Sequence, residues 1–369
     1  PQILAFSADP IRRSRLLRFA TWLEGDSGLT AAVLIIEGDG LAGRRKREAE
    51  QETLDRQIAD LGIDVHARAV LAADGMEALP VVVQAFGLGS LRANTALFGW
   101  PESDDAERKM RYLDALQDVY RLGVNVVAMS SDDARWEAME AAPAKQRRID
   151  VWWTKDDDTS RLSLLTAYLF TRTEAWSSST IRVLSNAADE VPPEQVREQL
   201  AEVLDAARIR AVPEVLEYPD ATTLVAACRD AALVILPMRF KRDRILGPFE
   251  TDLDTMLAGL PMTAGVLAGA PIDLAAGPDS GLPAMLKAAE EAVDDAAGRL
   301  DALRSAEIRW AERVARLQRE VESDRSATAL RRLAEAEGRL ARVSRRALSA
   351  QARVDGAKAE VARLTESGT

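Results

Sequence analysis

Short runs rich in β-branched and other apolar residues alternate with longer amphipathic runs through the first 270 residues of this chain. Such alternation predicts a parallel sheet with helices on both faces. In the first half we expect strands at 2–6, 30–36, 64–70, 94–99 and 124–129, and helices at 10–24, 44–61, 74–87 and 105–121. In the second half we expect strands at 149–154, 180–185, 210–217, 232–238 and 261–267, and helices at 160–173, 193–206, 220–230 and 249–258.

The sequence therefore predicts an α/β fold made of two tandem doubly wound parallel-sheet units, which form an internal pseudo-repeat. The first unit is expected at 1–142 and the second at 149–270, with a joint at 143–148 that begins at Ala142–Pro143. A chain of 369 residues with 47% hydrophobic residues has enough apolar surface for two such units.

The character of the chain changes after the second unit. A linker rich in glycine and proline is expected at 271–283, and residues 284–369 are rich in Ala, Glu, Arg and Leu. Apolar residues recur there at spacings of three and four, as in a coiled coil. The polar stretch 323–326 interrupts the first register and supplies a helix cap. We expect an antiparallel helical hairpin or coiled coil at 284–369, with one continuous helix as the alternative.

Composition excludes several classes of protein. No apolar run approaches the roughly 18–20 residues that span a bilayer. The net charge is −11, and residues 284–369 carry 17 Lys and Arg against 15 Asp and Glu, which leaves 31 against 44 in residues 1–283. An acidic main body argues against nucleic acid as a partner.

The catalytic and metal-binding motifs of common enzymes are absent. Cys228 and His66 are the only cysteine and histidine, so one chain forms neither a disulfide nor a Cys/His zinc site, which fits a reducing cytoplasmic setting. No P-loop motif and no G-x-S-x-G motif occurs. We expect no catalysis and no metal.

Two polar motifs have simpler explanations than ligand binding. The G-x-G-x-x-G motif at Gly38–Gly43 follows the second strand, whereas a dinucleotide fingerprint follows the first, so we interpret it as a flexible exposed loop. The basic run Arg44–Arg47 behind it could face anionic lipid or another anionic ligand. The three carboxylates of Asp156–Asp158 lack the alternating spacing of a calcium loop and predict a solvated turn.

One ligand crevice is predicted by topology. Ligands of doubly wound sheets bind outside the carboxyl ends of the strands, where the strand order reverses. In the first half, the residues at this point are Ser7 and Asp9 after the first strand, and Gly99 and Trp100 after the fourth.

The run Ile149–Trp153, with two adjacent tryptophans in one short strand, is close to a signature. Together with Gln84–Gly89, Asn94–Pro101 and Ala232–Pro237 it resembles the C-terminal cytoplasmic domain of the cation-chloride cotransporters. The similarity to the potassium-chloride branch is greatest at Gly28–Thr30, Glu37–Gly38 and Gly99–Pro101. The resemblance covers residues 1 to about 270, and the helical remainder has no counterpart in it. Trp152 and Trp153 are expected to be core residues at the seam between the halves.

The resemblance implies a fold like the universal stress proteins, a homodimer, and a place on the cytoplasmic side of the cell membrane. Coupled symport of chloride with potassium or sodium would belong to a transmembrane part encoded upstream of Pro1. Some family members hold an adenine nucleotide in the first half. Asp9–Pro10 and Arg12–Arg13 depart from the family there, so we expect no cofactor and keep adenine nucleotide as an open alternative.

The function expected from the sequence is thus a non-catalytic regulatory and dimerisation domain of a cation-chloride cotransporter. The alternative is a free-standing nucleotide-sensing protein of universal-stress type with a coiled-coil arm. Between residues 325 and 346 the tail carries seven arginines and two glutamates. This stretch is interpreted as a solvated helix face, or as a surface for the anionic inner leaflet or the acidic main body.

Overall fold

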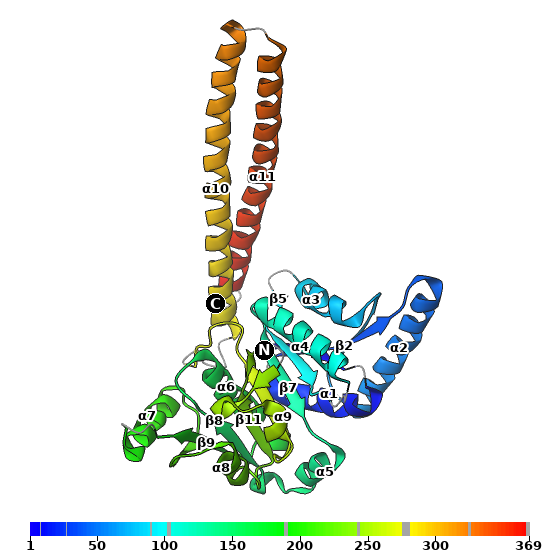
Figure 1. The fold of residues 1–369 in the computed structure, drawn as a ribbon, viewed down its shortest axis with the longest axis vertical. Helices are drawn as coiled ribbons and strands as arrows, with labels where there is room; N and C mark the ends of the chain where they lie inside the picture. Colours follow the sequence, from blue (N-terminus) through cyan, green and yellow to red (C-terminus); the bar gives the residue numbers. More distant parts are fainter. Residues whose placement is uncertain are drawn as a thin grey trace. The chain divides into compact units, whose positions relative to one another are not determined.

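The computed structural model describes residues 1–7, 9–26, 28–88, 91–101, 105–187, 191–241, 244–274, 281–323 and 326–366. Internal contacts divide the chain into two units, Pro1–Ala275 and Ala276–Thr369. The first unit is an α/β body and the second is a long pair of helices (Figure 1).

The first half of the body follows the predicted order. Its strands are β1 (Gln2–Phe6), β2 (Leu29–Glu37), β3 (His66–Ala72), β6 (Thr95–Gly99) and β7 (Asn125–Ser130). Its helices are α1 (Pro10–Glu24), α2 (Gly40–Leu61), α3 (Gly75–Ala85), α4 (Ala106–Arg121) and α5 (Asp133–Ala141). A small hairpin, β4 (Gly87–Leu88) with β5 (Leu91–Arg92), precedes β6.

The second half repeats this plan. Its strands are β8 (Arg148–Trp152), β9 (Thr180–Asn186), β10 (Ala211–Leu216), β11 (Leu233–Pro237) and β14 (Thr263–Leu267). Its helices are α6 (Asp158–Arg172), α7 (Pro193–Ala206), α8 (Ala221–Ala227) and α9 (Leu253–Leu257), with short 3-10 turns at Ala144–Gln146, Glu174–Trp176 and Pro248–Glu250. A hairpin of β12 (Arg239–Lys241) and β13 (Arg244–Leu246) lies between β11 and α9.

The two halves share one ten-stranded sheet of order β10-β9-β8-β11-β14-β7-β6-β1-β2-β3. Within each half the strands run parallel. From the outer edge to the centre, the order is β3-β2-β1-β6-β7 in the first half and β10-β9-β8-β11-β14 in the second, so the two halves have the same topology. The halves join where β14 pairs antiparallel with β7, with Gly265 opposite Ala128. Each half thereby covers the edge strand that the other would leave open. The α/β class with a helical region after it is confirmed.

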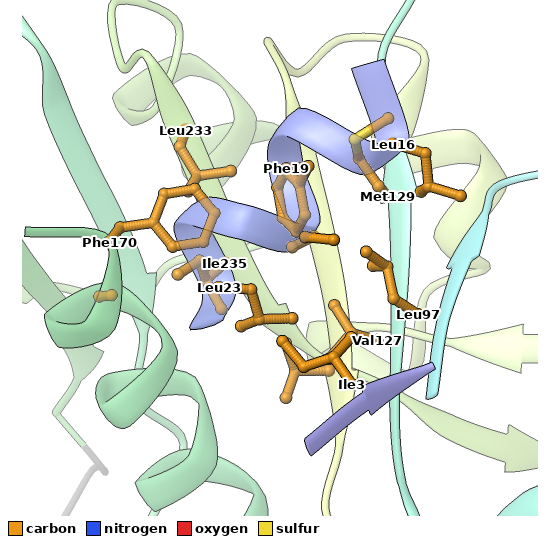
Figure 2. Packing of buried hydrophobic residues seen from close by; sticks show 14 of the residues in the cluster. Ile3, Leu16, Phe19, Leu23, Leu97, Val127, Met129, Phe170, Leu233 and Ile235 are labelled. Atoms are coloured by element: carbon orange, nitrogen blue, oxygen red, sulfur yellow. The ribbon is translucent and has the colours of Figure 1, made fainter. Parts of the chain in front are cut away.

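The sheet separates two hydrophobic cores. One face is covered by α1, α2, α5, α6 and α7, and the other by α3, α4, α8 and α9. Figure 2 shows the first core, where Phe19 and Leu23 of α1 approach Phe170 of α6 over strand residues such as Ile235. Trp152 belongs to one core and Trp153 to the other, since neighbouring strand residues point to opposite faces.

An aromatic cluster joins the two halves in the first core. Trp22 of α1 stacks on Trp136 of α5, with ring centroids 5.4 Å apart, and meets the edge of Trp176 at 5.5 Å. Phe170 of α6 packs against Trp176 at 5.4 Å and against Phe19 at 4.9 Å. Such edge-to-face and stacked pairs are worth about 0.5–1.5 kcal/mol each beyond their burial. The seam is therefore held by specific aromatic geometry.

One helix was not expected from the sequence. Helix α5 lies just before the predicted joint, and Asp132 caps it by accepting a hydrogen bond from the Arg135 amide at 2.8 Å. Trp136 and Met139 bury its inner face. Although Asp132 is a good capping residue, the helix is too short for a clear apolar period.

The second unit consists of α10 (Gly281–Ser323) and α11 (Ala327–Glu366). The helices are antiparallel, because Arg304 Nη2 donates to Gln351 Oε1 at 2.8 Å and Ser344 Oγ donates to Glu307 Oε1 at 2.5 Å. Ser326 Oγ accepts from the Ala329 amide at 3.3 Å and so caps α11. Thus a hairpin forms, not one continuous helix. No helix in the described ranges is both long and apolar enough to cross a membrane.

Candidate functional site

The predicted crevice exists at the carboxyl ends of β1 and β6, the adjacent strands at which the order of the first half reverses. A pocket of about 440 Å³ opens there. All four residues singled out by the sequence line it, namely Ser7, Asp9, Gly99 and Trp100. They come together because parallel strands end at the same edge of a sheet.

Asp9 is occupied in holding the start of α1. Its Oδ1 accepts from the Ile11 amide at 2.9 Å, and its Oδ2 lies 3.5 Å from Nε of Arg12. Ser7 Oγ donates to the Asp9 carbonyl oxygen at 3.2 Å. Asp9 therefore acts here as the helix cap of α1.

Gly99 forms the opposite wall. Its carbonyl oxygen accepts from the Tyr112 hydroxyl at 2.6 Å. The Tyr112 ring meets Phe98 edge-on at 6.2 Å, and Phe98 stacks on Phe6 at 5.2 Å. Burial raises the pKa of Tyr112, so its hydroxyl stays a donor. A Cβ at Gly99 would meet no atom within 4 Å, so the glycine leaves this wall open.

Trp100 ties the crevice to the second half of the body. It is buried, and its Nε1 donates to Asp254 Oδ1 of α9 at 2.6 Å. The other oxygen of Asp254 pairs with the Lys109 ammonium of α4. The indole is therefore fixed by a residue about 150 positions away. Sequence reasoning missed both Lys109 and Asp254, since no local pattern links them.

The charged residues that line the crevice are mainly cationic. Arg12, Arg15, Arg108 and Lys109 line the pocket, and Asp9 is the acid among its lining residues. Arg15 pairs with Asp133, whereas the Arg108 side chain has no ion pair or hydrogen bond within the described part of the chain. Guanidinium groups suit phosphate and carboxylate oxygens. Such side chains make the crevice chemically suited to an anion.

The G-x-G-x-x-G motif is part of helix packing. Helix α2 begins at Gly40, so the expected exposed loop is in fact the first turn of this helix. A Cβ at Gly43 would lie 3.0 Å from Leu71 Cδ1, which shows that the glycine lets α2 approach β3. Arg44 and Arg45 are exposed on the helix that follows.

The carboxylates of Asp156–Asp158 organise the start of α6. Asp157 caps it by accepting from the Ser160 amide at 2.9 Å, and Asp158 accepts from the Ile272 amide at 2.9 Å. Two hydrogen bonds from Arg161 lower the pKa of Asp156. No cluster of three or more His, Cys, Asp or Glu side chains suited to a metal occurs among the residues described.

The single histidine and cysteine lie away from the crevice. His66 is exposed at the first position of β3. Cys228 is fully buried at the end of α8, and burial raises its pKa. A buried thiol with a raised pKa is a poor nucleophile.

A buried charge network was also missed. Asp150 of β8 has no exposed surface and accepts from Arg148 Nε at 2.8 Å and from Arg182 Nη2 at 2.6 Å. Arg182 of β9 also donates to the Ala227 carbonyl at 2.8 Å and pairs with Glu214 at 3.1 Å. The sequence offered one sign of this network, because Asp150 is a charged residue within the otherwise apolar run at 149–153.

Comparison with known proteins agrees with this fold. Residues 138–222 match the model of Solute carrier family 12. A crystal structure of the cytoplasmic domain of a prokaryotic cation chloride cotransporter is similar to this chain, with a TM-score of 0.52 and 16% sequence identity. The match covers 73% of this chain and 95% of that one. The predicted resemblance is confirmed by these two findings, and neither assigns the potassium-chloride branch.

Proposed function

We propose that this chain is the non-catalytic regulatory and dimerisation domain of a cation-chloride cotransporter, on the cytoplasmic side of the cell membrane. The observation that carries the proposal is the family match at residues 138–222, which runs from α5 to the start of α8 within a body of the matching fold. Symport of chloride with potassium, sodium or both would be the work of the attached transmembrane part. The further partners of the domain described here would be a second copy of the chain and the anionic inner leaflet.

The body fits a regulatory role through its coupled halves. Asp254 connects the anion crevice of the first half to α9 of the second, and the aromatic cluster connects α1 to α6. A conformational change in one half of the body would therefore alter contacts of the other half. Coupling of this kind suits a domain that relays a signal to a transporter.

A second candidate is a nucleotide-sensing protein of universal-stress type, which the cationic crevice favours. The adenine nucleotide would place its phosphates near Arg108 and Lys109, which line the pocket beside Gly99. The two candidates differ in how strongly the crevice should hold a nucleotide. The sensor depends on nucleotide held tightly in this crevice, whereas the regulatory domain does not.

We expect calorimetric titration of the full chain with ATP to give a Kd no tighter than about 1 mM, or about −4 kcal/mol, and no hydrolysis. Weak binding is expected because Asp9 and Lys109 are engaged in internal contacts and no phosphate loop is present. A micromolar Kd that Arg108→Ala abolishes and Arg121→Ala on the same helix leaves unchanged would contradict this and favour the sensor. Arg108 is the suitable target because its side chain is exposed and its removal breaks no hydrogen bond or ion pair in the described structure.

A further inference from the structure

The two helices of the second unit sort their side chains by face. Each residue advances by about 100° around a helix. In an antiparallel pair, residues that directly precede an inward-facing position lie on one side of both helices, and those that directly follow lie on the other. The inward positions include Leu300 and Val314 of α10 and Ala336, Ala347 and Val354 of α11, all buried.

Arginines occupy the side formed by the preceding residues. We name this side the arginine face; it consists of Arg309, Arg313 and Arg316 of α10 with Arg332, Arg339, Arg342 and Arg346 of α11. Among the residues described, its acidic members are Glu320 and Glu335. The guanidinium of Arg313 lies 5.4 Å from the Trp310 ring and that of Arg339 lies 5.2 Å from the same ring. This shared contact places arginines of both helices on one side.

The opposite side has another character. It presents the large apolar side chains of Ile308, Leu330 and Leu348, which are 60%, 50% and 70% exposed. Among the residues described, its charged members are Asp301, Glu322, Glu337 and Asp355 with Arg304 and Lys358. Positive charge is thus concentrated on one side of the hairpin. Solubility alone would not require this one-sided distribution.

From this distribution we propose that the arginine face binds the anionic inner leaflet of the membrane. This inference rests on the proposed function, which puts the domain beside that leaflet. The α11 part of the face, Arg332 to Arg346, extends over about 21 Å of straight helix, a shape that fits a planar surface. Each Lys or Arg near an anionic membrane contributes about a fivefold gain in binding, within a Debye length of about 10 Å.

The partner is a lipid surface, not nucleic acid, because the remainder of the chain is acidic, with 31 Lys and Arg against 44 Asp and Glu in residues 1–283. A bilayer meets only the face that lies on it, whereas an acidic body on the same chain disfavours a long polyanion.

The test is co-sedimentation of the full chain with vesicles at low ionic strength. We expect binding to vesicles of phosphatidylserine and phosphatidylcholine, little binding to pure phosphatidylcholine, and loss on adding salt. Arg342→Glu with Arg346→Glu should weaken binding at least tenfold. The matched control is Arg304→Glu with Arg319→Glu, which changes the net charge equally but lies off the arginine face, and should change binding less than threefold.

A second pair, Arg313→Glu with Arg339→Glu, repeats the test at the Trp310 contact, with helix content checked by circular dichroism. Equal binding to neutral vesicles, or equal loss in face and control variants, would overturn the inference. Tighter binding to duplex DNA than to the anionic vesicles would overturn it as well. The proposed function is tested independently by chloride-dependent cation uptake, which can succeed or fail whatever the vesicle experiment shows.

Discussion

Replacing Trp176 with alanine should lower the free energy of unfolding of the α/β body by about 3–5 kcal/mol, the usual cost of emptying a large buried aromatic site. Trp176 has no exposed surface and contacts Trp22 and Phe170, so its loss leaves a cavity at the seam between the halves. Arg147 also lies over its ring at 5.5 Å. Urea unfolding followed by circular dichroism measures the effect.

The controls separate packing from the loss of an aromatic side chain. Tyr218→Ala removes a ring that is 81% exposed and should cost under about 0.5 kcal/mol. Trp176→Phe should cost less than Trp176→Ala, because it keeps part of the packing and removes an indole N–H that has no hydrogen-bond partner in the described structure. Equal losses for Trp176→Ala and Tyr218→Ala would contradict the account of the seam.

Replacing Asp150 with alanine should cost about 3–5 kcal/mol, because it removes the buried partner of an ion pair and leaves Arg182 with only the partly exposed Glu214 as a counter-charge. Arg182 is only 15% exposed, and Asp150 accepts two of its N–H groups, at 3.0 and 2.6 Å. Asp156→Ala is the matched control, since Asp156 also pairs with an arginine but at the surface, where such pairs are worth under about 1 kcal/mol. If both variants lose the same stability in urea, the network at Asp150 is not structural.

Secondary structure was largely predictable because strand and helix periods are local. The predicted strand at 2–6 and helix at 10–24 match β1 and α1, and the neighbouring tryptophans at 152 and 153 lie in opposite cores as alternation requires. The joining of both halves into one sheet was not predictable. The apolar residues of β7 and β14 predict that these strands are buried. They do not predict that the two strands pair with each other in antiparallel register.

The candidate site was predictable in its position and not in its chemistry. Ser7 and Gly99 lie together because the ends of adjacent parallel strands must meet. Asp254 reaches the crevice from the second half, and its contact with Trp100 depends on the tertiary arrangement of α9. The hairpin was predictable from its 3-4 spacing, whereas the sorting of its arginines needs the antiparallel pairing seen in Glu307 and Ser344.

The central proposal is that this chain is a domain of a cation-chloride cotransporter. The most direct measurement is rubidium uptake, as a potassium substitute, and sodium uptake by cells that express the complete coding sequence containing this chain. The account predicts uptake of at least one of these cations that stops when external chloride is replaced by an impermeant anion. Uptake of both cations that is the same with and without chloride, or a complete coding sequence without membrane-spanning segments, would contradict it.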